Sequence, residues 1–482
     1  MRKLVAVLSL GLIAATPAPS PDAKLKSLTA QVSTADLKRT LDKLVSFGTR
    51  HTLSSQTDPN RGIGAAQNWT ESEFRRYSAA CGNCLEVRRI SDTFTGARIP
   101  TPTKITDVFA IQRGTERPND VVIITAHIDS RVTDPLNSTA DAPGANDDGS
   151  GVAAIMEAAR ILSKHKFPGT IIYAPLPGEE QGLYGAKVLA AYAKAQGWNV
   201  VADINNDMIG NACGSDGLCD STHIRIFSEG PRWQGHEALA AQQRSMGGEN
   251  DSPSRNLSRF FAGLASRMKL GLEVRQMWRN DRFGRGGDHT EFLNAGFPAV
   301  RFIEAIENYD RQHQDLRTEK GKKYGDTIEG ISFPYLTKTT KLNVAALAAI
   351  ASAPPPPEPK VEGAVSTDTI LTWPQSIEAA AFRVWWRRTD ANRWEVSRLA
   401  IRPRECPLGL HGVPGQEYRP EDAPPFYFRP CKIVLPHIRI DDWVFGVSSV
   451  SKDGFESPVA SAVPGGAFKP YVAPPTQQTP AH

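Results

Sequence analysis

The sequence has almost no excess of either charge. Lys and Arg together number 56 and Asp and Glu together number 52, so the formal net charge of the 482 residues is +4. A strong basic excess is the usual signature of proteins that bind nucleic acid or an anionic membrane surface. The charge balance supports neither class, and we predict no nucleic-acid partner.

Beyond its first residues the chain also lacks an apolar run of the roughly 20 residues that a membrane span needs. A shorter apolar run, 4–15, follows Arg2 and Lys3 and gives way to the proline-rich residues 16–21. This order is typical of a secretory signal peptide. We predict a leader at 1–22 and a secreted or periplasmic protein with no membrane span after cleavage; an uncleaved membrane anchor is the alternative.

Cysteine is scarce, with six residues in the chain, and the six fall into pairs that are close in sequence. In an exported protein such pairs favour disulfides. A Cys-x-x-Cys spacing also suits a redox motif, which should start a helix after a strand, or half of a zinc knuckle, which needs a second cysteine pair that is missing. The predicted disulfides are Cys81–Cys84, Cys213–Cys219 and Cys406–Cys431.

The chain is longer than one hydrophobic core usually supports. Its 40% hydrophobic and 22% charged residues are typical of a globular protein. The proline run at 354–359 cannot continue a helix or a central strand, so we interpret it as a stiff linker. We predict a leader at 1–22, a large domain at 23–353, a linker at 354–360, a small domain at 361–465 and a proline-rich tail at 466–482.

Helical and strand patterns alternate through the large domain. Residues 120–126 form a β-branched run that is typical of a buried strand. Because helical crossovers connect parallel strands, the alternation predicts an α/β fold with a largely parallel sheet. The expected helices include 65–77, 151–163, 182–196 and 342–351, and the expected strands include 106–111, 120–126, 169–174, 200–206 and 297–302.

The small domain shows strand patterns only, at 369–373, 381–387, 432–435 and 442–450. Short strands of this kind predict a small β-sandwich. Leu-Thr-Trp in the first strand, Phe-Arg-Val-Trp-Trp-Arg in the second and Val-Ser-Ser-Val-Ser-Lys-Asp-Gly at the end of the last resemble a fibronectin type III module.

Five short segments place an acid or an imidazole just after a predicted strand or in a turn beside one, where open α/β sheets gather their ligands. In the first segment, strand 120–126 ends in His127-Ile128-Asp129. A metal-bound imidazole usually donates its other N–H to a carboxylate. We therefore expect Asp129 to orient His127.

The second segment, Gly-Ala-Asn-Asp147-Asp148-Gly-Ser-Gly, opens the helix predicted at 151–163. A single acid there needs no explanation beyond a helix cap, because the helix dipole favours acids at this end. Two adjacent carboxylates repel each other unless a cation lies beside them. The pair therefore indicates a cation site.

The remaining segments add two glutamates, one aspartate and a second histidine. Glu179 and Glu180 share a glycine-flanked turn, and neighbouring glutamates on a turn can point differently, which suits one metal ligand and one general base. Asp207 follows the next strand, and His289 closes the sequence Gly-Gly-Asp-His. Each segment alone is ordinary loop chemistry, and their order carries the signal.

Taken together, the segments resemble those of the M28 family of zinc peptidases, an aminopeptidase group with two co-catalytic zinc ions. The matching elements are His-x-Asp, Gly-Ala-x-Asp-Asp-x-Ser-Gly, Gly-Glu-Glu-x-Gly-Leu-x-Gly, the aspartate of Asn-Asp-Met, and Asp-His before a phenylalanine. The resemblance covers roughly residues 35–352. It implies the zinc-exopeptidase fold, a mixed and mostly parallel sheet flanked by helices, beside the C-terminal β-sandwich.

The resemblance also implies a ligand set for two Zn²⁺ ions per chain. One ion would be bound by His127 and Asp207 and the other by Glu180 and His289, with Asp147 bridging the two. Imidazole and carboxylate ligands suit zinc, although cobalt or manganese could substitute.

The same resemblance assigns the chemistry. Glu179 would be the general base that activates a shared water, and the substrates would be peptides cleaved next to a free amino terminus. The bond from Asp147 to Asp148 would be a cis peptide, which is rare for a residue other than proline.

Two regions depart from the family pattern. Many relatives carry a tyrosine or another donor before the Asp-His pair, whereas this chain has arginines, among them Arg282 and Arg285. These are candidates for gripping a substrate, although exposed arginines near glycine are also typical of a solvated loop. His313 lies where relatives place a histidine near the substrate, before an Asp-Thr pair that Asp326 and Thr327 would supply.

Two other functions remain open at this stage. Glutaminyl cyclases, which are transferases, share this scaffold but usually lack the second metal site. A non-catalytic binding protein on a peptidase scaffold would be expected to have lost ligands or the base. All five ligand positions here can bind metal, which favours a hydrolase, and a count of bound metal ions would separate the alternatives.

Overall fold

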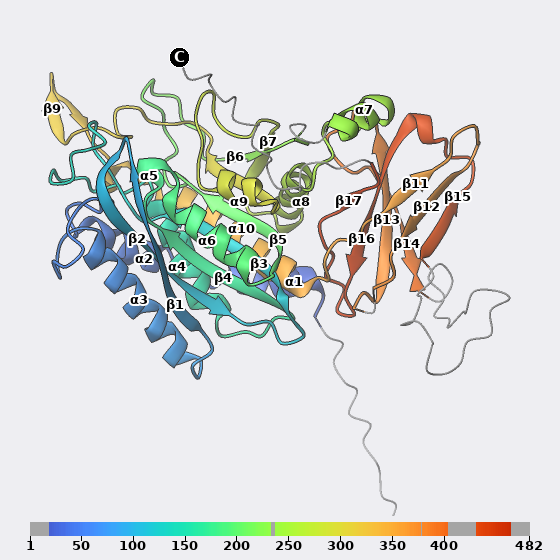
Figure 1. The fold of residues 1–482 in the computed structure, drawn as a ribbon, viewed down its shortest axis with the longest axis horizontal. Coiled ribbons are helices and arrows are strands. Elements are labelled where there is room, and N and C mark those ends of the chain that lie inside the picture. The colour runs from blue at the N-terminus through green and yellow to red at the C-terminus, as the bar shows by residue number, and fades with distance from the viewer. Residues whose placement is uncertain (1–18, 233–236, 377, 403–429, 464–482) are drawn as a thin grey trace, which may run out of the picture.

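An eight-stranded sheet forms the centre of the computed structural model, which describes residues 19–232, 237–376, 378–402 and 430–463 (Figure 1). The central strands are parallel to one another, and antiparallel pairing occurs toward both edges. This confirms the predicted α/β fold. In sheet order the strands are β1 (Glu86–Gly96), β2 (Ile99–Gln112), β4 (Gly169–Leu176), β3 (Arg117–His127), β5 (Asn199–Asn206), β8 (Ala299–Glu304), β6 (His223–Ser228) and β7 (Glu273–Met277).

Helices bury both faces of this sheet. The first face packs against α1 (Pro21–Thr29), α2 (Thr34–Val45), α3 (Ile63–Ala80), α4 (Gly149–Leu162), α8 (Pro253–Met268) and α10 (Phe333–Ser352). The second face packs against α6 (Tyr184–Ala195) and α9 (His289–Ala295). The remaining elements of this part are α5 (Glu179–Gly182), α7 (Glu237–Met246), the turn η1 (Ile328–Gly330) and the hairpin β9 (Arg317–Glu319) with β10 (Lys322–Tyr324).

The strand β3 shows why the sheet needs cover on both sides. Val122 and Ile124 lie in the core cluster of the first face, whereas Val121 and Ile123 lie in that of the second. Successive side chains of a strand point to opposite faces, so an unbroken apolar run must be buried twice. The strand leaves this apolar run at its carboxyl end, where His127 stands.

Two predicted helix bounds differ from the structure for local reasons. The helix expected at 182–196 is divided, because Leu183 adopts a left-handed conformation with φ of 62° and separates α5 from α6. The helix expected at 342–351 starts earlier, at Phe333. Pro334 stands in its first turn, where the missing N–H of proline costs nothing.

Two further sheets follow α10. Their facing sides share a core in which the Trp373 and Phe382 rings meet edge to face. The likeness to a fibronectin type III module and the exact domain bounds remain predictions. One sheet contains β11 (Lys360–Glu362), β12 (Thr369–Trp373) and β15 (Cys431–Leu435), and the other contains β14 (Val396–Ile401), β13 (Ala381–Arg388), β16 (Trp443–Val450), which follows the turn η2 (Ile440–Asp442), and β17 (Ala460–Ser461).

A buried ion pair joins these sheets to the larger part of the molecule. Arg387 of β13 donates from Nη2 to Asp251 Oδ2 at 2.7 Å and to Oδ1 at 2.9 Å, and the two side chains are 2% and 3% exposed. Asp251 lies directly before the Ser252 cap of α8 and also accepts from the Ser461 hydroxyl at 2.8 Å. The contact therefore fixes β13 and β17 against the start of α8.

Removing one partner of this pair is expected to destabilise the protein. Arg387→Met would leave the buried Asp251 carboxylate with only a more distant counter-charge, Arg259 Nη1 at 3.9 Å. Breaking a buried ion pair typically costs about 3–5 kcal/mol of unfolding free energy. Urea denaturation followed by tryptophan fluorescence measures the loss. The neighbouring Arg388→Met is the control, because that side chain is 62% exposed, and equal midpoints for the two variants would contradict a stabilising role for the buried pair.

Two of the three predicted disulfides are present, Cys81–Cys84 and Cys213–Cys219. The third prediction involves Cys406, which lies outside the described residues. Within the described ranges, every helix is too short or too polar to serve as a membrane span.

The predicted leader lies mostly outside the described residues. Its expected end at residue 22 falls inside α1, which begins at Pro21 and buries Leu25 and Leu28 in the core. A leader that ended there would take away the first turn of a packed helix.

Candidate metal centre

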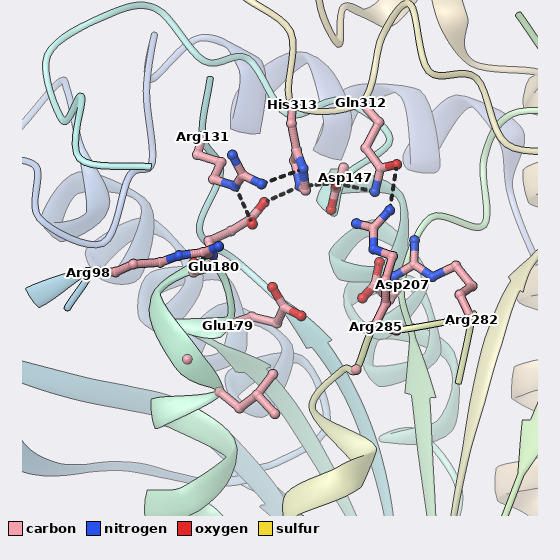
Figure 2. Close-up of a pocket in the computed structure, with 14 residues that line it drawn as sticks. Arg98, Arg131, Asp147, Glu179, Glu180, Asp207, Arg282, Arg285, Gln312 and His313 are labelled. Atoms are coloured by element: carbon pink, nitrogen blue, oxygen red, sulfur yellow. Dashed lines mark hydrogen bonds and ion pairs between the residues drawn. The ribbon is translucent and has the colours of Figure 1, made fainter. Parts of the chain in front are cut away.

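The carboxyl ends of the central parallel strands meet at one edge of the sheet. β3 ends at His127, β5 ends just before Asp207, and a short turn after β4 carries Glu179 and Glu180. Asp207, Glu179 and Glu180 line a cavity of about 460 Å³, which is drawn in Figure 2. The buried His127 lies next to Asp147, which also lines this cavity. The convergence follows from topology, because parallel strands bring all their carboxyl ends to the same edge.

His127 is fixed through both ring nitrogens. Its Nε2 lies 2.9 Å from Asp147 Oδ1 and 3.9 Å from Asp207 Oδ1. Its Nδ1 lies 3.0 Å from the main-chain oxygen of Asp129 and 3.5 Å from Oδ1 of the same residue. Asp129 therefore lies beside the ring as expected, but its main-chain carbonyl is the nearer partner.

The Asp129 carboxylate instead holds the turn after β4. It accepts from the Thr52 hydroxyl at 2.8 Å and from the backbone N–H groups of Glu179 and Glu180 at 3.3 and 3.2 Å. Gly178 starts this turn with φ of 82°, a conformation that glycine adopts without strain. Asp129 thus positions both glutamates and the histidine together.

The carboxylates of the adjacent Asp147 and Asp148 make different contacts. Their peptide bond is cis, as the resemblance implied. The Asp148 carboxylate accepts from the backbone N–H groups of His127, Gly151 and Met208 at 3.1, 2.9 and 3.1 Å, which caps α4 and ties it to two strand ends. Asp147 turns to the cavity instead, beside His127.

Asp326 holds the loop that carries Asp147. Its carboxylate accepts from the backbone N–H of Asn146 at 2.9 and 3.0 Å and from that of Asp147 at 2.7 Å. The sequence suggested that Asp326 and Thr327 belong to the substrate side of the site. The structure gives Asp326 a positioning task within the loop.

Asp207 is held by a buried arginine that sequence reasoning missed. Arg301 of β8 lies 2.7 Å from Asp207 Oδ2 through Nη2 and 2.7 Å from Asp281 Oδ2 through Nη1, and it is fully buried. The sequence signal for this residue was a charge flanked by apolar residues within the strand, in Ala-Val-Arg-Phe-Ile. Because burying an unpaired charge is costly, such a residue requires carboxylate partners nearby.

The second imidazole that the structure brings beside the carboxylates is His313, and it does not bring His289, the histidine assigned from sequence, to the cavity. His313 Nε2 lies 3.0 Å from both Asp147 Oδ2 and Glu180 Oε1. The His289 ring is fully buried and directs Nε2 to the main-chain and side-chain oxygens of Asn280 at 3.0 and 3.1 Å. Sequence order suggested His289 because the Asp-His motif follows the other segments, but α9 begins at that residue and turns its ring away from the cavity.

The remaining candidates, Arg282 and Arg285, do line the cavity. Arg282 Nη1 donates to Glu307 Oε2 at 2.9 Å, and Arg285 Nη1 donates to Gln312 Oε1 at 3.3 Å. Neither guanidinium makes a hydrogen bond or ion pair with Asp147, Glu179 or Glu180. Their place at the cavity wall is compatible with a contact to substrate.

Burial and neighbouring charges shift the pKa values of Glu179 and Glu180 in opposite directions. Burial raises the pKa of Glu179 to about 8, and the nearby Glu180 and Asp207 carboxylates add to the rise. Although burial opposes it, the His313 imidazole holds the pKa of Glu180 at about 2. The two neighbouring carboxyl groups therefore differ strongly in pKa.

The donor atoms fit bound metal. Groups of three such atoms within 4.8 Å of one another are formed by His127, Asp147 and Asp207, by Asp147, Glu180 and His313, and by His127, Glu179 and Glu180. Buried carboxylates crowded around imidazoles need positive charge, and imidazole nitrogen with carboxylate oxygen is a common donor set for divalent transition metals. Asp147, His127 and Glu180 each belong to two of these groups.

Comparison with known proteins identifies the family. A model of peptidase family M28 matches residues 107–333. The chain is also 40% identical over 454 residues to a Leptosphaeria maculans protein described as a probable zinc metalloprotease, covering 93% of this chain and 98% of that one. The chain belongs to peptidase family M28. A Pyricularia oryzae protein with the same description is 39% identical to this M28 peptidase over 457 residues, covering 92% and 85% of the two chains.

The fold of the M28 peptidase also resembles solved structures. The crystal structure of the aminopeptidase LapA of Legionella pneumophila matches 73% of this chain and 80% of its own, with a TM-score of 0.50 and 20% sequence identity. At that identity the likeness concerns the fold alone.

Proposed function

We propose that this M28 peptidase is an exported zinc-dependent aminopeptidase. The observation that carries the proposal is the pair of ligand groups that share Asp147, with the Glu179 side chain beside them at the cavity. Metal ligands, a candidate base and a cavity for a substrate thus lie together, as hydrolysis requires.

In this proposal two zinc ions are bound by the residues of these groups. His127 and Asp207 would hold one ion and Glu180 and His313 the other, with Asp147 between them. His313 replaces His289 in the set inferred from sequence. When bound, zinc supplies Lewis-acid chemistry, which polarises a scissile carbonyl and acidifies an attacking water.

The protein groups then carry the proton and hold the geometry. Glu179 would accept a proton from the attacking water as its oxygen bonds to the scissile carbon. It would return that proton to the departing amine as the carbon–nitrogen bond breaks. Asp129, through the backbone N–H groups of Glu179 and Glu180, keeps the base and a ligand in fixed positions, which is the preorganisation that catalysis needs.

Restriction to the amino terminus is the family's usual activity, and it is tested directly by a blocked substrate. We expect a panel of aminoacyl p-nitroanilides to be cleaved, cleavage to stop after chelation and return with added zinc, and the N-acetylated forms to resist. Cleavage of acetylated peptides at internal bonds would contradict the aminopeptidase assignment.

Counting metal separates this proposal from the related transferase activity. Two zinc ions per chain, measured by atomic emission after dialysis, are expected. One ion together with cyclisation of amino-terminal glutamine would favour a glutaminyl cyclase instead. Tight metal binding without turnover of any peptide would favour a binding protein.

Export rests on the basic and apolar first residues and on the disulfides. Two disulfides are present among the described residues, and such bonds persist in oxidising compartments. Retention of the mature chain inside the producing cell would contradict this part of the proposal.

A further inference from the structure

Four arginines line the cavity of the metal centre, and two of them are neutralised by the protein. Arg131 Nε lies 2.7 Å from Glu180 Oε2, and Arg282 Nη1 lies 2.9 Å from Glu307 Oε2. In each case the charge has a carboxylate partner that is almost fully buried. These two guanidinium groups are therefore committed to holding protein groups.

The other two arginines have no such partner. Within the part of the chain that the structure describes, neither Arg98 nor Arg285 has a carboxylate oxygen within ion-pair distance. Arg98 Nη1 donates to the main-chain oxygen of Glu180 at 2.7 Å, and Arg285 Nη1 donates to Gln312 Oε1 at 3.3 Å. A guanidinium has five N–H donors, so most donors on both remain available to a ligand.

The two unpaired arginines lie on opposite sides of the base. Figure 2 shows Arg98 reaching toward Glu180 on one side, Arg285 near Asp207 on the other, and Glu179 between them. Arg98 comes from the turn between β1 and β2, and Arg285 comes from the loop before α9. A substrate with its scissile bond at Glu179 would extend toward both guanidinium groups.

The charges that line the cavity favour a ligand that carries a carboxylate. The acids of the cavity wall are Asp147, Asp207 and the two glutamates, and three of these are assigned to metal. Arg98 and Arg285 are both exposed, and their unpaired guanidinium charges would then face the substrate at the cavity wall. Planar guanidinium forks match carboxylates better than any neutral group of a peptide.

A solvated loop is the simpler explanation for one exposed arginine beside glycine. It accounts less well for two arginines from distant segments that line the same cavity, each anchored by one N–H to a residue that contacts or forms the metal centre. Gln312, the anchor of Arg285, itself donates to Asp147 Oδ2 at 3.3 Å. Both anchors thus keep a guanidinium close to the reacting groups.

We propose that Arg98 and Arg285 bind carboxylates of the substrate, so that this peptidase prefers peptides with an acidic group next to the scissile bond. The inference rests on the proposed peptidase function and adds its substrate class. The carboxylate can come from an Asp or Glu side chain or from the free carboxyl terminus of a dipeptide. Matched substrates distinguish these sources.

Substrate pairs that differ only in charge test the preference with the zinc-loaded, full-length enzyme. Glu-Ala-amide against Gln-Ala-amide and Ala-Glu-amide against Ala-Gln-amide probe side chains, and Ala-Ala against Ala-Ala-amide probes the terminus. At least one acidic member should have a kcat/KM about 10–100-fold higher, since a hydrogen bond to a charged group contributes about 1.5–3 kcal/mol. Ratios near one in all three pairs would overturn the inference.

Variants then assign the preference to the two arginines. Arg98→Gln and Arg285→Gln should each bring the acidic-to-neutral ratio of one or more pairs toward one. Arg88→Gln is the matched control on β1, because that arginine pairs with Glu86 at the surface outside the cavity. An unchanged ratio in both cavity variants would overturn the assignment.

A binding measurement separates this inference from the proposed function. Calorimetry with the zinc-loaded Glu179→Gln protein compares, without turnover, the Kd of Ala-Glu-amide and Glu-Ala-amide with those of their glutamine forms, and the Kd of Ala-Ala with that of Ala-Ala-amide. Tighter binding of an acidic member that is lost when Arg98→Gln or Arg285→Gln is added supports the inference. It does so even if the unmodified enzyme hydrolyses no peptide, and that absence of hydrolysis would refute only the proposed function. Equal Kd values beside normal hydrolysis of neutral peptides by the unmodified enzyme would refute only the inference.

Discussion

Replacing Glu179 with glutamine is expected to lower kcat by a factor of about 10²–10⁴, the usual contribution of a general base. Glutamine keeps the size of the side chain but cannot accept the proton of the attacking water. The zinc content should not change, because the proposed ligands all remain. Steady-state kinetics on an aminoacyl p-nitroanilide and atomic emission on the same sample measure the two quantities.

The control for this variant is Glu273→Gln, which removes a carboxylate whose side chain is 81% exposed on β7. It should turn over like the unmodified enzyme. If Glu179→Gln also retained full kcat, another group would have to move the proton. If it lost zinc, Glu179 would be a ligand, as its place in a group with His127 and Glu180 permits.

Replacing His313 with alanine is expected to remove about one of two zinc ions and to lower kcat/KM by more than a hundredfold. Loss of an outer partner of a metal ligand already costs about 10–100-fold, so loss of a ligand should cost more. His313 Nε2 lies 3.0 Å from both Asp147 and Glu180, which makes it the imidazole of that group. Metal analysis after dialysis and kinetics with added zinc provide the measurements.

His289→Gln is the comparison that decides between the two histidines. Glutamine can still donate to Asn280, which is the contact of the buried His289 ring, so this variant should keep both zinc ions. A variant at His289 that lost zinc while His313→Ala retained it would restore the assignment made from sequence alone.

Some of the site could be predicted because it depends on local chemistry. His127 ends a buried strand, and Asp207 and the turn of Glu179 and Glu180 follow buried strands, so these polar side chains appear at the strand ends. Parallel strands then bring such ends together whatever the loop lengths are.

The two positioning roles that the sequence did not predict depend on contacts across long sequence distances. Arg301 reaches Asp207 from β8, and Asp326 reaches the backbone of Asp147 across 179 residues. The sequence shows Arg301 as a charge within a strand and Asp326 as part of an Asp-Thr pair. Neither pattern indicates which residue each of them contacts. Only the packing of the strands and loops determines which carboxylate meets which donor.

The sequence by itself determined the α/β fold and the order of the segments that carry the candidate metal ligands, because periodicity and residue chemistry are local properties. The tertiary structure alone decided which histidine lies beside the other candidate ligands. His289 starts a packed helix and faces Asn280, whereas His313, in a loop outside the regular elements, reaches Asp147 and Glu180. Loop conformation depends on contacts with the whole fold, and no periodic pattern in the chain records it.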